Sequence, residues 1–147
     1  MLWLNAYKKE ILFYQHKIKD RYIKSIFFGG GTPSLMDPKT IEGIIELISS
    51  IAIVDEETEI TIEANPTSYE AAKFHDFKAA GINRVSIGVQ SILDERRAFL
   101  GRKHSAKEAI KAIESAASLF DRFSFDLIYA TPNQTLSSWN SELQEAL

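Results

Sequence analysis

Strand-like and helix-like segments alternate along the whole chain, and this alternation constrains the fold more than any other feature. β-prone runs occur at 24–28, 59–64, 84–89 and 124–130. Segments whose apolar residues recur at steps of three and four, the pattern of an amphipathic helix, precede the first run and follow every run. Strands that alternate with helices form βαβ crossovers and therefore a parallel sheet. The sequence predicts an α/β fold, with the sheet either open or part of a (βα) barrel.

The helical segments carry their own start signals. Asp37 and Pro38 provide an N-cap and a proline at the first helical position. Ser105 and Glu108 have the spacing of a capping box. Helices are expected at 3–19, 38–50, 68–80, 93–100, 105–120 and from about residue 135 to the end of the chain.

Charge and cysteine content exclude several classes of function. The 17 basic and 20 acidic residues give a net charge of −3, so no global attraction draws the chain to nucleic acid or an anionic membrane. The absence of cysteine excludes disulfides, thiolate zinc sites, a cysteine nucleophile and a self-sufficient iron–sulfur cluster. No apolar run approaches the roughly 18 residues of a membrane span. The N-terminus does not resemble a signal peptide, and the expected location is the cytoplasm.

Glycines and polar residues gather where the predicted strands end. Ligands of parallel α/β folds bind at the C-terminal ends of the strands. The segment GGGTP follows the first strand, Glu63 and Asn65 follow the second, Gln90 follows the third, and Asp126 lies within the fourth. No Gly-Lys-Ser/Thr follows the glycines, which excludes a phosphate-binding P-loop. The glycine run alone is equally consistent with a tight turn.

The side chains at these strand ends have complementary chemistry. Glu63 can bind an ammonium group, and Arg102, in the segment GRKHS, can hold a carboxylate through two hydrogen bonds. Gln90 and Asp126 can bind the hydroxyls of a sugar, and Asp126 lies in an apolar run where an unpaired carboxylate would be costly to bury. Singly, Glu63 could face solvent and Arg102 could be a surface charge. Together, an ammonium, a carboxylate and a ribose describe S-adenosylmethionine.

Three histidines provide no metal site. No two of His16, His75 and His104 have metal-ligand spacing. His16 and His75 are expected in solvent. His104 either helps to shape the site or simply leads into the helix cap at Ser105, and we favour the second role.

Five segments in combination resemble a known family: FFGGGTPSLM, TIEANPTS, GINRVSIGVQS, LGRKHS and FDLIYATPNQT. They are similar to the radical S-adenosylmethionine (radical SAM) family of oxygen-independent coproporphyrinogen III oxidases, and more narrowly to the HemW-like heme chaperones. The resemblance covers nearly the whole chain from about Trp3. The segments EANP and GRKHS resemble the chaperone branch, so coproporphyrinogen oxidase activity is not expected.

The resemblance implies a fold, a ligand and a set of contact residues. Residues 1–147 would form part of a radical SAM core domain, a (βα)6 partial barrel. The family also holds a [4Fe–4S] cluster on a CxxxCxxC loop after its first barrel strand, and its HemW-like branch binds heme and passes it to acceptor proteins. The positions that bind S-adenosylmethionine in the family are occupied here by Gly30, Gly31, Thr32, Glu63, Gln90, Arg102 and Asp126.

The sequence departs from the family pattern in three places. The first strand with its cysteine loop and the last barrel strand are not among these 147 residues, and Ala130 stands where the family usually has glycine. We therefore expect no cluster on this chain and only weak binding of S-adenosylmethionine. One interpretation is a fragment of a HemW-like chaperone that is inactive alone. The alternative is a cluster-free binding module, or half of a split protein that needs a separate N-terminal piece. Expected partners are S-adenosylmethionine, heme, that piece or a heme acceptor.

Overall fold

The computed structural model describes residues 2–147 and confirms the predicted α/β architecture. Its centre is a four-stranded sheet in the order β1-β2-β3-β4, and each neighbouring pair is parallel. The strands are β1 (Ser25–Phe28), β2 (Glu59–Ala64), β3 (Arg84–Gln90) and β4 (Arg122–Leu127). Parallel strands in sequential order form an arc of a barrel.

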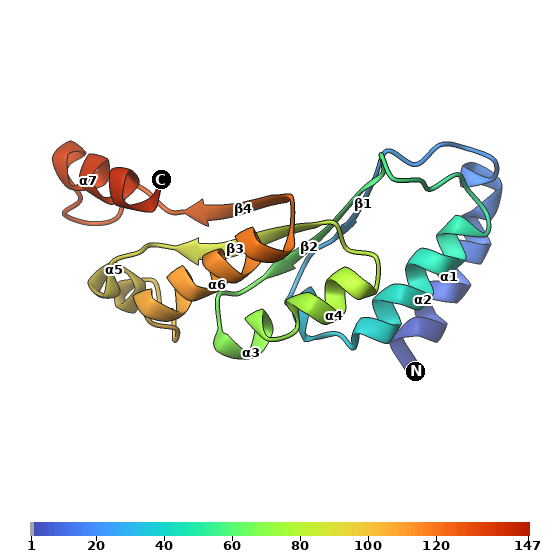
Figure 1. Ribbon diagram of the computed structural model, residues 1–147, viewed down its shortest axis with the longest axis horizontal. Helices are drawn as coiled ribbons and strands as arrows, with labels where there is room; N and C mark the ends of the chain where they lie inside the picture. Colours follow the sequence, from blue (N-terminus) through green and yellow to red (C-terminus); the bar gives the residue numbers. More distant parts are fainter. Residues whose placement is uncertain (1) are drawn as a thin grey trace.

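Helices lie between consecutive strands and at both ends of the chain (Figure 1). They are α1 (Leu2–Ile18), the 3₁₀ helix η1 (Pro33–Leu35), α2 (Pro38–Ser49), α3 (Ser68–Ala71), α4 (Phe74–Ala79), α5 (Asp94–Phe99), α6 (Ala106–Leu119) and α7 (Leu136–Ala146). The expected caps are present: Asp37 accepts a hydrogen bond from the backbone N–H of Lys39, and Ser105 and Glu108 form a reciprocal capping box. Among the described residues, no helix has the length and apolar character of a membrane span.

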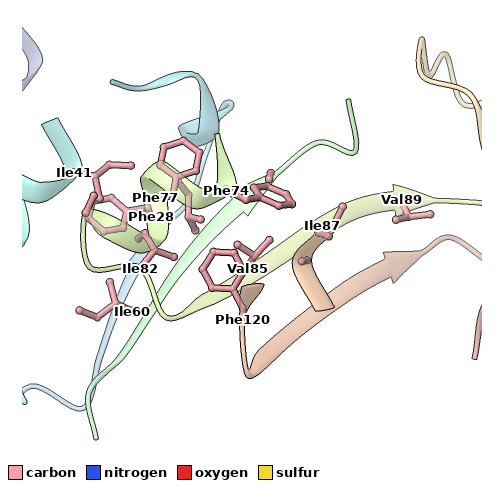
Figure 2. Close-up of a cluster of buried hydrophobic side chains, with 14 of the residues drawn as sticks. Phe28, Ile41, Ile60, Phe74, Phe77, Ile82, Val85, Ile87, Val89 and Phe120 are labelled. Carbon is pink, nitrogen blue, oxygen red and sulfur yellow. The ribbon is translucent and has the colours of Figure 1, made fainter. Parts of the chain in front are cut away.

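The hydrophobic core lies between the sheet and helices α2, α4 and α6 (Figure 2). Strand β3 shows the period of two that such packing requires, because Val85, Ile87 and Val89 are buried while the residues between them are less so. Phe74 of α4 is fully buried and meets Phe120 edge to face, with 6.1 Å between the ring centroids. This geometry is favourable for aromatic pairs.

The opposite face of the sheet is polar. The carboxylate oxygens of Glu59 form ion pairs with guanidinium nitrogens of Arg84, at 3.7 Å, and of Arg122, at 3.6 Å. Arg84 also donates a hydrogen bond to the hydroxyl of Ser124 at 2.8 Å. All four residues lie on β2, β3 or β4, and the register of the sheet places them near its N-terminal edge. The face turned away from the helices therefore carries hydrogen-bonding groups rather than core side chains.

Strand β4 begins and ends earlier than the predicted 124–130. Its pairing with β3 starts with Arg84 opposite Arg122, and the register shifts between Ile87 and Gln90. Beyond Leu127 the chain turns, and Ala130 has a φ of 59°. That backbone conformation is one that glycine adopts without steric cost. The turn thus explains physically why glycine would suit this position.

The single helix predicted over 68–80 is instead two short helices, α3 and α4, separated at residues 72–73. The apolar residues of this segment recur at a constant step of three, namely Ala71, Phe74, Phe77 and Ala80. In a continuous α-helix each step of three falls about 60° short of a full turn, so this set would rotate away from the core. The break allows both halves to face the sheet.

Replacement of Phe74 by alanine tests the core. Phe74 is fully buried, and Phe→Ala changes at such sites cost roughly 3–5 kcal/mol because a cavity remains. We expect Phe74→Ala to lower the free energy of unfolding by about that amount, measured by urea denaturation followed by circular dichroism. The control is Phe99→Ala, because Phe99 is 64% exposed and its removal opens no cavity. Equal effects of the two substitutions would contradict the described core.

Candidate functional site

A cavity of about 230 Å³ opens at the C-terminal edge of the sheet. Of the predicted site residues, Gly30 alone is not part of its wall. The wall includes Gly31, Thr32, Glu63, Gln90, Arg102 and Asp126. The structure therefore brings together residues that are as much as 95 positions apart between Gly31 and Asp126.

Strand register explains this convergence. Glu63 of β2 lies opposite Ser86 of β3, and Ser86 lies opposite Ser124 of β4. Asp126 is two residues beyond Ser124, so its side chain projects from the same face of the sheet. Because alternate residues of β3 are buried on the other face, Glu63, Ser86 and Asp126 all belong to the polar face.

The glycine turn after β1 fixes the position of Glu63. Gly30 and Gly31 have φ values of 77° and 59°, a region that glycine enters without steric cost. This conformation allows the backbone N–H of Gly30 to donate a hydrogen bond to Oε2 of Glu63 at 3.2 Å. At Gly29, an added Cβ would lie 2.6 Å from the ring of Phe27 and 3.3 Å from the same carboxylate oxygen. The turn is therefore in contact with Glu63, although Gly30 does not line the cavity.

Gln90 has an unusual backbone conformation for a residue that is not glycine. Its φ is 70°, and such conformations cost roughly 1–3 kcal/mol and gather at functional sites. The carbonyl of Gln90 accepts a hydrogen bond from the N–H of Ile128 at 2.8 Å, which joins the end of β3 to the chain after β4. At Gly88, an added Cβ would lie 3.2 Å from Nε2 of Gln90. The glycine thus leaves room for the Gln90 side chain at the cavity wall.

Arg102 reaches the cavity from a loop that a buried arginine holds in place. Gly101, just before it, has a φ of 67°. Arg97 is 1% exposed and donates hydrogen bonds to the carbonyls of Ser91 at 2.8 Å and His104 at 3.2 Å. Its guanidinium therefore connects the loop after β3 to the loop that carries Arg102.

Asp126 lies in the expected place but in a different environment. The apolar neighbours of Asp126 suggested a buried carboxylate, whereas the structure shows its side chain exposed at the cavity wall. Sheet alternation places the apolar residues Phe125 and Leu127 on the opposite face. Burial of a charge is therefore not an argument for a role of Asp126. The argument for a role is its position beside the other cavity residues.

His104 is more deeply placed than a residue that only leads into a helix. It is 8% exposed, and its ring nitrogen Nε2 lies 3.4 Å from the carbonyl oxygen of Val89. Burial lowers the pKa of His104 below its usual value, and the positive charges of Arg97 and Arg102 act in the same direction. The Val89 carbonyl and Glu108 raise this pKa but do not compensate. His16 and His75 are exposed, as expected.

The depressed pKa of His104 predicts a pH dependence of stability. The folded state favours the neutral ring, so the unfolded chain binds more protons as the pH falls below the ordinary histidine value of about 6.5. The free energy of unfolding should therefore decrease between pH 7.5 and pH 5.5, measured by urea denaturation at each pH. This slope should be smaller in His104→Gln and unchanged in His75→Gln, which alters an exposed histidine. An unchanged slope in His104→Gln would contradict the assignment.

The donors at the cavity do not fit an iron–sulfur cluster. The chain has no cysteine, and residues 2–147 include no group of three histidine, cysteine, aspartate or glutamate side chains that could hold a metal ion. The wall instead offers two carboxylates, two amides (Asn65 and Gln90) and a guanidinium. These groups suit a polar organic ligand with ammonium, carboxylate and hydroxyl groups. The wall therefore offers hydrogen-bonding groups that match those of S-adenosylmethionine, whereas it has no thiolate for an iron–sulfur cluster.

Comparison with known proteins identifies the family. A family model described as the radical SAM superfamily matches residues 7–145. The chain belongs to the radical SAM superfamily. Radical S-adenosyl methionine domain-containing protein 1, mitochondrial, of Bos taurus is 43% identical over 86% of this chain and 29% of its own length. Heme chaperone HemW of Escherichia coli (strain K12) is 40% identical over 86% of this chain and 34% of its own length.

A solved structure supports the same assignment. Coproporphyrinogen III oxidase (HemN) from Escherichia coli, described as a radical SAM enzyme, superposes with a TM-score of 0.85 at 27% identity. The match covers 99% of this chain and 34% of that protein. This chain therefore spans about a third of the length of the relatives it matches. The predicted resemblance to a radical SAM family with HemW-like and HemN-like members is confirmed.

Buried residues near the site, Glu70 and Arg97 among them, were not predicted from the sequence. Glu70 is 4% exposed and contacts the loops after β1 and β2, and Arg97 spans the loops after β3 and α5. The one signal for Glu70 is its spacing from Thr67, which is that of an ordinary capping box. Arg97 lies beside another arginine in a short helix, a pattern typical of an exposed helical face.

Proposed function

We propose that residues 1–147 form the S-adenosylmethionine-binding part of a HemW-like radical SAM heme chaperone. The observation that carries this proposal is the gathering of Glu63, Gln90, Arg102 and Asp126 on one cavity at the C-terminal strand edge. Heme transfer would be a property of the whole protein. The name heme chaperone, which the HemW relatives bear, supports this extension to the present chain.

In this proposal, different cavity residues bind different groups of S-adenosylmethionine. The Glu63 carboxylate would accept hydrogen bonds from the amino group, and Arg102 would hold the carboxylate of the amino-acid portion. Gln90 and Asp126 would contact the ribose hydroxyls. Two carboxylates beside one guanidinium also favour a ligand with a sulfonium cation. Gly31 and Thr32 would close over the ligand from the turn after β1.

A second candidate, half of a split protein, is favoured by the free edge of β1. Among the described residues, β1 pairs with β2 on one side and has no strand on the other. An apolar groove of about 870 Å³ runs along this edge, with walls that include Trp3, Tyr7, Ile26 and Ile44. In this proposal a separate segment with a strand and a CxxxCxxC loop pairs with β1. The cluster, which supplies the electron for cleavage of the sulfonium in the family, would belong to that segment.

Binding of S-adenosylmethionine tests the first proposal. Titration calorimetry on the chain should detect weak binding, and Glu63→Gln should weaken it by roughly 10-fold to 100-fold, since a charge-assisted hydrogen bond contributes about 1.5–3 kcal/mol. Glutamine keeps an oxygen for the N–H of Gly30, so the substitution removes mainly the charge. The control is Glu95→Gln on α5, which alters an exposed carboxylate away from the cavity wall. Equal affinities of the two variants, or no binding by the wild-type chain, would refute the proposal.

Anaerobic reconstitution with iron and sulfide tests the split-protein candidate. The chain alone should acquire no cluster absorbance and release no 5′-deoxyadenosine from S-adenosylmethionine, because it has no thiolate ligands. When a chemical reductant supplies the electron for the cleavage, a mixture with a polypeptide that carries the strand and CxxxCxxC loop of a HemW relative should gain both signals. The control polypeptide has serines in place of the cysteines. A cluster on the chain alone would contradict the ligand argument, and none in the mixture would count against the split protein.

A further inference from the structure

Glu70 is a buried carboxylate that lies outside the cavity and contacts two of its walls from behind. It belongs to α3 and is 4% exposed. Its Oε2 atom accepts hydrogen bonds from the hydroxyl of Ser34 and from the backbone N–H of Asn65, the latter at 2.7 Å. Its Oε1 atom accepts from Nδ2 of Asn65 at 3.3 Å and from the hydroxyl of Thr67 at 3.5 Å. One side chain therefore holds two segments of the chain.

The partners of Glu70 directly adjoin the residues of the proposed ligand site. Ser34 follows Thr32 and Pro33, which line the cavity after β1. Asn65 lines the cavity itself and follows Glu63 by two residues. The carboxylate of Glu70 thus lies at the junction between the glycine turn and the end of β2.

Lys73 strengthens the attachment of the glycine turn to this region. Its Nζ atom donates hydrogen bonds to the carbonyl oxygens of Ser34 and Met36, both at 2.7 Å. Lys73 lies in the break between α3 and α4, one helical turn beyond Glu70. Side chains from this segment therefore satisfy the hydroxyl and the carbonyl of Ser34 at once.

We propose that Glu70 is a positioning residue for the ligand site. By holding Ser34 and Asn65 on one carboxylate, it sets the distance between the glycine turn and β2, and so keeps the N–H of Gly30 on the carboxylate of Glu63. The identity of the ligand rests on the proposed function. The positioning of the two walls does not, because it follows from contacts within the chain.

A purely structural brace would behave differently from a positioning residue. Removal of Glu70 leaves the hydroxyl of Ser34 and the N–H of Asn65 without their acceptor, which destabilises the fold in either case. Only the positioning role predicts that the glycine turn changes its conformation in the protein that remains folded. The discriminating measurement is therefore local and must be made on folded protein.

The experiment compares Glu70→Ala and Glu70→Gln with Asn83→Ala. Asn83 lies at the opposite edge of the sheet, where its side chain accepts from the N–H of Ile60 and donates to the carbonyl of Thr58, both at 2.8 Å. Its replacement removes two side-chain hydrogen bonds away from the cavity. For each variant we would measure the urea midpoint, the backbone amide chemical shifts of Gly30 and Gly31 by NMR, and the dissociation constant for S-adenosylmethionine.

Glu70→Ala should shift the amide resonances of Gly30 and Gly31 and weaken S-adenosylmethionine binding by about tenfold or more. Glu70→Gln should retain much of the wild-type glycine resonances and of the affinity for S-adenosylmethionine, because its amide oxygen can still accept hydrogen bonds from Ser34 and Asn65. Asn83→Ala should lower the urea midpoint but leave the two glycine resonances unchanged. If Glu70→Ala does not fold, Ser34→Ala, which removes a single contact, provides the same comparison.

The proposal would be overturned if the Gly30 and Gly31 amide resonances did not shift in folded Glu70→Ala, or in Ser34→Ala when Glu70→Ala does not fold. It would also be overturned if Asn83→Ala shifted these resonances equally. The two proposals fail in distinguishable ways. If the wild-type chain does not bind S-adenosylmethionine, the proposed function fails, while the amide shifts still decide whether Glu70 positions the turn.

Discussion

Parallel pairing of β2, β3 and β4, which places Glu63, Ser86 and Ser124 opposite one another, is the interaction on which the rest of the structure depends. It separates side chains into two sets, because successive residues of a strand project to opposite faces. One set, with Val85 and Ile87, packs against the helices, and the other, with Glu63 and Asp126, remains on the polar face. A shift of one residue in any pair would exchange these sets. The same register thus forms the core and assembles the cavity.

Buried charged side chains hold the loops that leave the C-terminal edge of this sheet. Glu70 joins the loops after β1 and β2, and Arg97 joins the loop after β3 to the loop of Arg102. Glu142, from α7, accepts hydrogen bonds from the hydroxyl of Ser91, from the N–H of Ile92 at 3.2 Å and from Arg96 at 2.8 Å. Charged groups at such depth are tolerated only when their hydrogen bonds are satisfied. Each therefore restricts its loop to a geometry that satisfies them.

The sequence was sufficient to predict the fold and six of the residues that line the cavity, but not how the cavity is supported. Alternating strands and helices, the cap at Asp37 and the capping box at Ser105 all depend on local rules, and the structure bears them out. The break between α3 and α4 and the burial of His104 depend on contacts with distant segments. For the same reason Glu70 was missed, because its partners Ser34 and Asn65 lie across a loop and not along its helix.

The polar face of the sheet has different charges at its two ends. Near the N-terminal edge, Arg84 and Arg122 share the single carboxylate of Glu59. Near the C-terminal edge, Glu63 and Asp126 outnumber Arg102 at the cavity. Among these six side chains, the excess charge therefore changes from positive near the N-terminal ends of the strands to negative at the cavity. A cation at the cavity would therefore meet more negative than positive charge on these side chains, and added salt would weaken that attraction by screening it.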